Sequence, residues 1–310
     1  MSTHKRESRE NTVSVGLIGI GPWGMKLASR FDAQANLRGF TAKGNAERVE
    51  IFKKEFPSVT HYSSTEALLE DTSIQAVVIA TPIETHFEMA RLALNHGKHV
   101  FVEKPAALDQ TSVRELIGLA QKHNRVLFTG YTFLYHPVYK HLRELIKDTP
   151  PQRIIFSWQK LGSFRESGIL NLICHDVALF ADLVGELRGS HIFFRADIIG
   201  KDDIAQIGSS FGTAGSALFT INRVFPGIPT KSVVVMTDSE TYVWENDALY
   251  KASDGSLHDI TEKVIASQPL EQECSHFLER VAEDTYWSRS DGVHDMEVAR
   301  FFEEVMPPSA

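Results

Sequence analysis

The sequence predicts an α/β protein with two domains, an N-terminal doubly wound parallel sheet and a C-terminal α+β domain built on a largely antiparallel sheet. Short apolar runs alternate with amphipathic windows up to about Tyr135, and this pattern changes after Pro150-Pro151. The length of 310 residues is enough for two hydrophobic cores. We expect a disordered tail at residues 1–11 and domains at residues 12–135 and 136–310.

Five continuous apolar runs are expected as the strands of the first domain, because a strand covered on both faces of a parallel sheet is apolar throughout. Four windows of helical periodicity lie between them. Strands and helices in this alternation build the Rossmann fold. The expected strands are Val13–Ile18, Leu37–Ala42, Ala76–Ala80, His99–Val102 and Val126–Thr129, and the expected helices are Met25–Phe31, Ala46–Phe56, Ile83–Asn95 and Thr111–His123.

The second domain is expected to open with an apolar helix at Ile169–Leu183. In the segments that follow, polar and apolar residues alternate at close spacing, which favours an antiparallel sheet. The expected strands are His191–Ile199, Ile204–Phe211, Ser216–Val224, Lys231–Thr237 and Thr241–Glu245, followed by helices at Glu271–Glu283 and Val293–Val305.

The composition excludes several classes of protein. A formal net charge of −8 argues against a general nucleic-acid or anionic-membrane binder. Cys174 and Cys274 form neither a disulfide framework nor a metal-ligand spacing, and the thirteen histidines form no metal motif. We see no signal peptide and no apolar stretch of the ~20 residues that a membrane helix needs. We therefore expect a cytoplasmic protein without a catalytic metal.

A glycine-rich segment follows the first expected strand directly. Gly19-Ile20-Gly21-Pro22-Trp23-Gly24 matches G-x-G-x-x-G and opens the next helix. Its glycines permit a tight turn and a close approach of the backbone, so the helix N-terminus can hold a pyrophosphate. We expect these six residues to bind a dinucleotide; the alternative is a glycine turn with only a structural role.

The end of the second expected strand indicates which dinucleotide is bound. An NAD site usually carries an acidic residue there, which binds the ribose 2′-hydroxyl. Here Lys43 follows Ala42 instead. A cation suits the 2′-phosphate of NADP, so we expect NADP, with NAD as a possible cofactor. The alternative for Lys43 is a solvated surface lysine.

The strand expected at His99–Val102 ends in Glu103-Lys104-Pro105. A residue before proline is restricted to extended geometry, so Lys104 projects from a defined backbone. This lysine either lies in an ordinary exit loop or is directed at a ligand.

Together these segments resemble the Gfo/Idh/MocA superfamily, which is named for glucose-fructose oxidoreductase and inositol dehydrogenase. The KGNAE stretch that begins at Lys43 is similar to the NADP-preferring branch, and the resemblance covers nearly the whole chain. The other matching segments are GIGPWG at 19–24, AVVIATPIETH at 76–86, VEKPAAL at 102–108, CHD at 174–176, E-x-x-H-F at 273–277 and SDG at 290–292.

The resemblance implies roles for several residues. It places Lys104 beside the nicotinamide and the reacting hydroxyl, where an ammonium can polarise an oxygen or move its proton, while Glu103 helps to fix the site. It also implies that Thr81, Pro82 and His86 line the cofactor cleft. For His86, a structural role is an equal alternative, since the residue lies at a helix N-terminus.

Asn171 and His175 lie four residues apart and share one face of the expected helix. They match the family's D-x-x-x-H pattern, in which the histidine is the general acid/base toward the substrate hydroxyl. Asn171 stands where the family usually has aspartate, and an amide binds a hydroxyl but takes up no proton. Proton chemistry would then depend on His175 and Lys104. Asp176 is one residue on, about 100° around the helix.

The expected helix at Ile169–Leu183 is preceded by four residues that line either the substrate pocket or the domain core, namely Trp158, Gln159, Phe164 and Arg165.

The segment Gly208-Ser209-Ser210-Phe211-Gly212 matches the G-x-S-x-G elbow of hydrolases, which requires a strand-to-helix turn. Because this copy lies among expected antiparallel strands, we reject hydrolase chemistry.

The sequence therefore predicts an NADP-dependent oxidoreductase that acts on a small molecule, namely a sugar, polyol or sugar derivative. The alternative is a non-catalytic NADP-binding sensor or regulatory protein on the same fold, which the exchange to Asn171 favours. If one face of the second-domain sheet has no helical cover, its exposed apolar surface predicts a homodimer or homotetramer.

Overall fold

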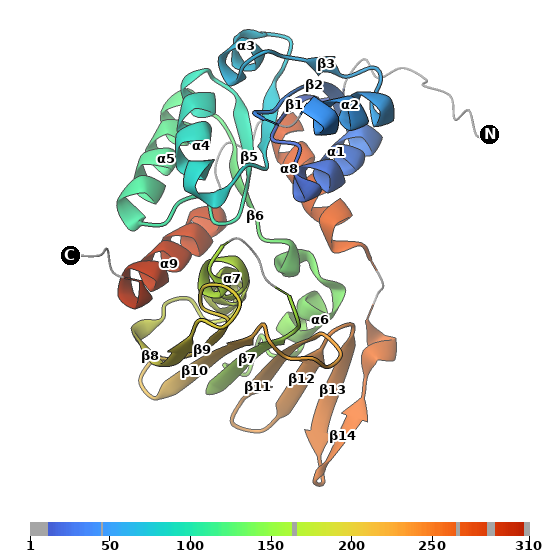
Figure 1. The fold of residues 1–310 in the computed structure, drawn as a ribbon. Coiled ribbons are helices and arrows are strands. Elements are labelled where there is room, and N and C mark those ends of the chain that lie inside the picture. The colour runs from blue at the N-terminus through green and yellow to red at the C-terminus, as the bar shows by residue number, and fades with distance from the viewer. Residues whose placement is uncertain (1–11, 45, 163–165, 265–266, 284–288, 307–310) are drawn as a thin grey trace. The chain divides into compact units, whose positions relative to one another are not determined.

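The computed structural model describes residues 12–44, 46–162, 166–264, 267–283 and 289–306, drawn in Figure 1. The expected tail at residues 1–11 lies outside this range. The chain divides into two compact units. The first unit contains the chain up to Ala107, Thr111–Gly130 and Leu270–Asp291, and the second contains Leu108–Gln110, Tyr131–Pro269 and the chain from Gly292 onward.

The first unit is built on a six-stranded, fully parallel sheet in the order β3-β2-β1-β4-β5-β6. This confirms the doubly wound sheet. The strand order reverses direction between β1 and β4, and ligands of such sheets bind beside this point, at the carboxyl ends of the strands. The strands are β1 Ser14–Ile18, β2 Asn36–Thr41, β3 Thr60–His61, β4 Ala76–Ile79, β5 His99–Glu103 and β6 Leu127–Gly130.

Helices cover both faces of this sheet, with α4 and α5 on one face and α1 and α8 on the other (Figure 1). Val77, Ile79, Val100 and Val102 are fully buried in the core against Leu116 of α5. The short elements β3 and α3 were not predicted, because two to six residues carry too little periodicity. The helical segments are α1 Pro22–Gln34, α2 Ala46–Glu55, α3 Thr65–Glu70, the 3-10 turn η1 Ile83–Thr85, α4 His86–Asn95, α5 Gln110–His123 and α8 Pro269–Ala282.

Helix α8 belongs to the first unit, although the sequence places it in the second domain. Its Phe277 lies with ring centroids 6.1, 5.6 and 5.7 Å from those of Phe31, Phe101 and Phe128. Phe277 is fully buried, so the apolar face of α8 completes the core of the parallel sheet. The first boundary also differs from the expected residue 135, since the first unit ends its sheet at Gly130.

The second unit is built on an eight-stranded sheet in the order β14-β13-β12-β11-β7-β10-β9-β8. Neighbouring strands are antiparallel except β7 and β10, which are parallel, so the largely antiparallel sheet is confirmed. The central strand β7 was not predicted, and neither were β13 and β14. The strands are β7 Arg153–Gln159, β8 Arg188–Ala196, β9 Ile204–Phe211, β10 Gly215–Asn222, β11 Thr230–Met236, β12 Thr241–Glu245, β13 Ala248–Ser253 and β14 Ser256–Asp259.

The segment Gly208–Gly212 starts inside β9, within this antiparallel sheet. It has no strand-to-helix turn, so the structure also excludes the nucleophile elbow.

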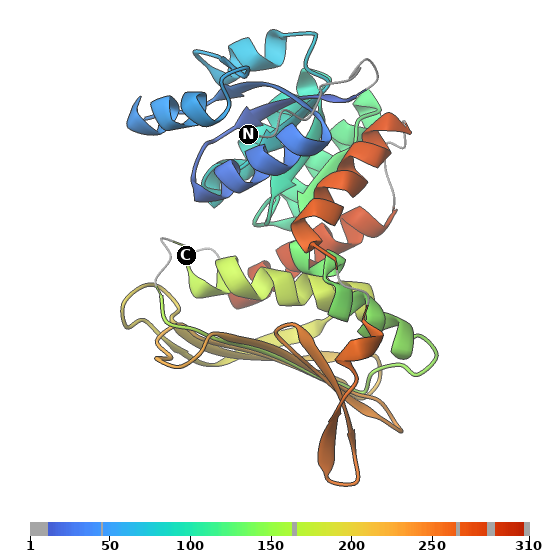
Figure 2. The same ribbon diagram turned by 90° about the vertical axis from the view of Figure 1, so that its right-hand side faces the viewer.

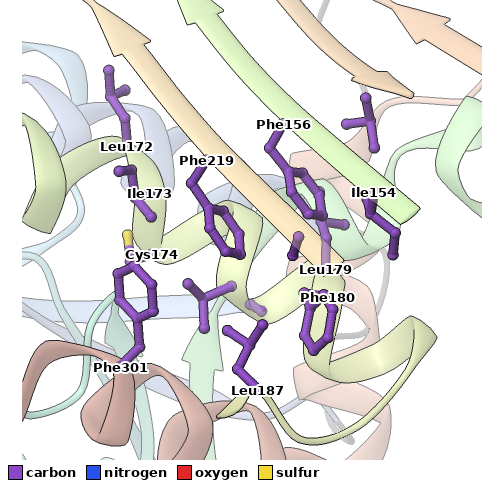
Figure 3. Packing of buried hydrophobic residues seen from close by; sticks show 14 of the residues in the cluster. Ile154, Phe156, Leu172, Ile173, Cys174, Leu179, Phe180, Leu187, Phe219 and Phe301 are labelled. Carbon is purple, nitrogen blue, oxygen red and sulfur yellow. The ribbon is translucent and has the colours of Figure 1, made fainter. Parts of the chain in front are cut away.

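The core of the second unit lies between this sheet and the helices on one of its faces (Figures 2 and 3). Phe156 of β7 stacks on Phe219 of β10 at 5.0 Å, and Phe301 of α9 lies 5.4 Å from Phe219. The expected helix at 169–183 begins as a π-helical turn. The helical segments are the 3-10 turn η2 Thr132–Tyr135, α6 Pro137–Leu145, the π turn η3 Ile169–Ile173, α7 Cys174–Leu183, the 3-10 turn η4 Thr261–Lys263 and α9 Arg289–Val305.

The opposite face of the second sheet carries none of the described helices (Figure 2). One row of paired residues crosses this face, and its side chains are all partly exposed. The row consists of Leu218, Ile155, Val234, Val243 and Tyr250. We call these five residues the open-face row; it is an apolar stripe on a sheet face that the described chain leaves uncovered.

Candidate functional site

The glycine loop joins β1 to α1, and a side chain at each of its three glycines would meet different surroundings. Gly19 has φ of +99°, and a Cβ there would lie 2.5 Å from the Ala80 carbonyl oxygen. A Cβ at Gly24 would lie 2.2 Å from the carbonyl oxygen of Gly19. A Cβ at Gly21 would meet no protein atom within 4 Å. The space beside Gly21 is therefore open to a ligand, whereas Gly19 and Gly24 close the turn.

Helix α1 begins directly in this loop. Gly21 is its N-cap, Pro22 its first residue, no side chain caps it, and its first turn contains no acidic residue. The first backbone N–H groups of a helix have no partner within the helix and attract anions. With the open space at Gly21, this arrangement fits the pyrophosphate of a dinucleotide.

Lys43 is exposed and lies two residues after Thr41, the last residue of β2, at the same edge of the sheet. Residues 41–44 contain no carboxylate. The charge of Lys43 contributes to lowering the pKa of Glu66 in α3, although the main causes are the backbone N–H of Glu66 and the hydroxyl of Ser64. Asn45, within the KGNAE stretch, lies outside the described residues.

Thr81, Pro82 and His86 follow β4, and hydrogen bonds connect them. The Thr85 hydroxyl lies 2.7 Å from both the Thr81 hydroxyl and the Pro82 carbonyl oxygen. The buried His86 ring lies 2.8 Å from the Pro105 carbonyl through Nδ1 and 2.8 Å from the Thr81 carbonyl through Nε2. Burial lowers the pKa of His86, and these two carbonyls oppose that shift. His86 thus joins the loop after β4 to the loop after β5.

Glu103 is the last residue of β5, and its side chain is buried. The indole N–H of Trp23, in the glycine loop, donates a hydrogen bond to this carboxyl group. Burial raises the pKa of Glu103 to about 7, while the charge of Lys104, the Trp23 hydrogen bond and the Lys104 backbone N–H oppose the shift. Lys104 is partly exposed, and its peptide bond to Pro105 is cis.

In the second unit, Asn171 lies in the π turn η3 and His175 in the first turn of α7. Both are partly exposed. The Asn171 amide donates to Glu166 Oε2 at 3.4 Å, and the His175 ring packs edge-on against Phe133 with centroids 5.0 Å apart. A π turn inside a helix frequently occurs at functional sites.

Next to His175, Asp176 points into the core and is fully buried. It forms an ion pair with Lys231 of β11 and accepts a hydrogen bond from Trp158 Nε1 of β7 at 2.7 Å. The sequence analysis missed Lys231. One signal was available, because Lys231 has the same strand parity as the buried residues Val233 and Val235 and should therefore face inward.

The structure thus gathers the glycine loop, Lys43, Thr81, His86, Glu103 and Lys104 at the carboxyl edge of the first unit's sheet. It places Asn171 and His175 on one helical segment of the second unit. Trp158 lies against His175, with centroids 6.5 Å apart, and Gln159 is exposed at the end of β7. Phe164 and Arg165 lie outside the described residues, as do the side chains of Ser290 and Asp291.

Membrane-spanning helices and metal-binding clusters are both absent from the described part of the chain. None of its helices is both long and apolar enough to span a membrane. Within the same ranges, no group of three or more His, Cys, Asp or Glu side chains is arranged to bind a metal ion.

Comparisons with known proteins agree with the fold of both units. Residues 13–131 match the Gfo/Idh/MocA family, described as an oxidoreductase family with an NAD-binding Rossmann fold. A UDP-N-acetylglucosamine 3-dehydrogenase from Acidithiobacillus ferrooxidans is 33% identical over 180 residues, which cover 55% of this chain and 54% of that protein. The chain thus matches about half the length of this relative.

Two solved structures are similar over nearly the whole chain. UDP-N-acetylglucosamine 3-dehydrogenase GnnA from Acidithiobacillus ferrooxidans has a TM-score of 0.84 at 25% identity, covering 94% of this chain and 96% of that one. KijD10, a 3-ketoreductase from Actinomadura kijaniata in complex with TDP-benzene and NADP, has a TM-score of 0.83 at 16% identity, covering 96% and 98%. The second likeness shows the fold alone.

Proposed function

Because residues 13–131 match the Gfo/Idh/MocA oxidoreductase family, we propose that this chain is an NADP-dependent member of it. It would transfer a hydride between nicotinamide and a carbinol or carbonyl carbon of a sugar, polyol or sugar derivative. The proposal rests mainly on the carboxyl edge of the parallel sheet. The glycine loop, which leaves open space beside Gly21, and Lys104 both lie at this edge.

Lys43 is proposed to select the cofactor. It is exposed at the end of β2, where an acid would bind the ribose 2′-hydroxyl of NAD. A lysine ammonium can instead donate charge-assisted hydrogen bonds to the 2′-phosphate of NADP. Cytoplasmic location, where NADP is available, is part of the same proposal.

The proposed chemistry separates hydride transfer from proton transfer. When bound, the nicotinamide supplies the carbon that accepts or donates the hydride. Lys104 hydrogen-bonds the reacting substrate oxygen and stabilises the negative charge that develops on it. His175 is the general acid/base that accepts the hydroxyl proton in oxidation or returns it in reduction. Asn171 binds a neighbouring hydroxyl through its amide without exchanging a proton.

A screen with both dinucleotides tests the proposal, with UDP-N-acetylglucosamine, simple sugars and inositols as substrates and nicotinamide absorbance as the readout. We expect turnover with at least one sugar derivative and a preference for NADP. Binding of NADP without turnover on any of these compounds would instead support the sensor alternative, which Asn171 in place of aspartate favours. In that case, Asn171→Asp should be tested for a gain of activity.

The two residues of the second unit should affect different kinetic constants. His175→Ala should lower kcat by about 10²- to 10⁴-fold, the usual contribution of a general acid/base. Asn171→Ala should mainly raise KM, because it removes a binding contact. His258→Ala, on the exposed strand β14, is the control and should behave as wild type. A His175→Ala enzyme with wild-type kcat would remove His175 from the mechanism.

We also propose that a second copy of the chain covers the open-face row, which gives a homodimer or homotetramer. Val234→Glu places a charge in the middle of this row and should lower the mass measured by light scattering to that of one chain. Lys201→Glu, an exposed position in the turn between β8 and β9, is the control for an added negative charge. A wild-type protein that is monomeric at micromolar concentration would contradict the proposal.

A further inference from the structure

The buried ion pair between Asp176 and Lys231 lies next to His175 in the fold and has no part in the chemistry proposed above. Asp176 is 0% exposed and Lys231 is 5% exposed. A buried ion pair usually stabilises a fold no better than apolar residues of the same size would, because both charges lose their hydration. Burial accordingly raises the pKa of Asp176 and lowers that of Lys231, and their contact opposes both shifts.

The pair contacts the aromatic rings that touch His175. The Lys231 ammonium lies 4.2 Å from the ring centroid of Trp158 and 4.8 Å from that of Phe133. Asp176 accepts the Trp158 N–H hydrogen bond at 2.7 Å, which fixes the rotation of the indole. Phe133 and Trp158 also pack edge-on against each other at 5.4 Å.

His175 lies against the same two rings, at 5.0 Å from Phe133 and 6.5 Å from Trp158. Phe133, Trp158 and His175 are each partly exposed, whereas the ion pair is buried. Cation–π contacts and the indole hydrogen bond are directional, so they hold the rings in one orientation more strictly than apolar packing does. The His175 imidazole therefore packs against two aromatic rings, and the buried ion pair of Lys231 and Asp176 sets the orientation of these rings.

We infer that Lys231 and Asp176 are positioning residues, which hold Phe133 and Trp158 so that these rings fix the orientation of the His175 imidazole. The inference rests on the proposed role of His175 as the proton-transferring group. It assigns the ion pair to the geometry of the site, since a misplacement of a catalytic group by about 1 Å can cost about 100-fold in rate.

The test must separate positioning from folding, because removing one member of a buried ion pair can unfold a protein. We therefore use the paired variant Lys231→Met/Asp176→Leu, which leaves neither charge unpaired and keeps the volume similar. The control is Lys251→Met. Lys251 belongs to the same sheet, pairs with Glu240 and lies 5.9 Å from the Tyr242 ring.

The first readout requires no turnover. Ring currents of Phe133 and Trp158 displace the proton resonances of the His175 imidazole, which are assigned by comparison with His175→Ala. In the folded paired variant these resonances should move toward the values of an unfolded chain, while Lys251→Met leaves them in place. Unchanged His175 resonances in a folded paired variant would overturn the inference.

The second readout is kinetic, with the substrate found in the screen. The paired variant should lose about 10- to 100-fold in kcat, with NADP affinity at the wild-type value. A wild-type kcat in the paired variant would overturn the inference. If wild-type protein itself shows no turnover, the proposed function fails, and the NMR experiment still decides whether the pair positions His175.

Discussion

Glu103 in the first unit and Asp176 in the second are both buried carboxyl groups that accept a hydrogen bond from an indole N–H. They differ in how a lysine acts on them. Lys231 of strand β11 contacts Asp176 of helix α7 directly, whereas Lys104 is the next residue after Glu103 and influences it through its charge and backbone N–H. The first arrangement joins distant parts of the fold, and the second arises within one short motif.

This difference indicates what each carboxyl group can do. Asp176, in contact with an ammonium, forms a charged pair that depends on both members. Glu103 has a pKa of about 7, so its charge changes near neutral pH. The indole hydrogen bond is common to both, and it ties a neighbouring segment to the carboxyl group, namely the glycine loop in one unit and β7 in the other.

The largest effects should distinguish the two lysines. Lys231→Met alone should lower the free energy of unfolding by about 3–5 kcal/mol, because Asp176 is left as an uncompensated buried charge. Lys104→Met should change it by about 1 kcal/mol or less, since Lys104 is partly exposed, but should lower kcat by about 100-fold or more.

Urea unfolding and steady-state kinetics measure both quantities. Lys122→Met, which is exposed at the end of α5, is the control for the loss of a lysine from the first unit. If Lys104→Met unfolded as readily as Lys231→Met, or kept its full kcat, the assignment of stability to Lys231 and of turnover to Lys104 would be wrong.

Glu103 should make stability depend on pH near neutrality. Its pKa in the folded protein, about 7, lies above the ordinary value of 4.5, so the folded state binds the proton more tightly. The resulting stabilisation is complete below about pH 4.5 and is lost as the pH rises through 7, at about 1.4 kcal/mol for each unit of pKa difference.

Glu103→Gln should remove this part of the pH dependence when the unfolding free energy is measured between pH 5 and about 8. The exposed residue Glu115 of α5 provides the control, and Glu115→Gln should keep the wild-type slope. A wild-type slope in Glu103→Gln would show that another group titrates in this range.

The smallest effect concerns the cofactor. Lys43→Ala should weaken NADP binding by about 1–3 kcal/mol, the usual contribution of a hydrogen bond to a charged group, and leave NAD binding nearly unchanged. Calorimetric titration with each dinucleotide measures both affinities. Lys54→Ala, exposed in the last turn of α2, should alter neither of them. Equal losses for NADP and NAD would exclude contact with the 2′-phosphate.

Local patterns predicted most of the first unit from the sequence. Strand β4 is a continuous apolar run and β5 contains another at Val100–Val102, and the glycine loop is a motif of six consecutive residues. The helix Pro269–Ala282 was assigned to the wrong unit, because its periodicity shows an apolar face but not which sheet that face covers. Only the contacts of Phe277 decide this.

The site in the second unit was less predictable, because it depends on contacts between distant segments. His175 and Asn171 were found through a resemblance to a family, and Asp176 was noted only as a neighbour at a different angle. Its partners come from β7 and β11, and β7 itself was missed. No local pattern shows that Lys231 lies opposite Trp158, since strand pairing is set by the whole sheet.

The position of α8 has a consequence for how the chain is made. The parallel sheet is complete at Gly130, but Phe277, which fills the space between Phe31, Phe101 and Phe128, leaves the ribosome only after the whole eight-stranded sheet has been synthesised. During that interval the three aromatic rings lack this contact, and we expect a nascent chain in this state to bind chaperones. A fragment that stops after residue 130 would keep this exposed surface permanently. The N-terminal unit, although first in the sequence, therefore cannot complete its core until α8 has been synthesised.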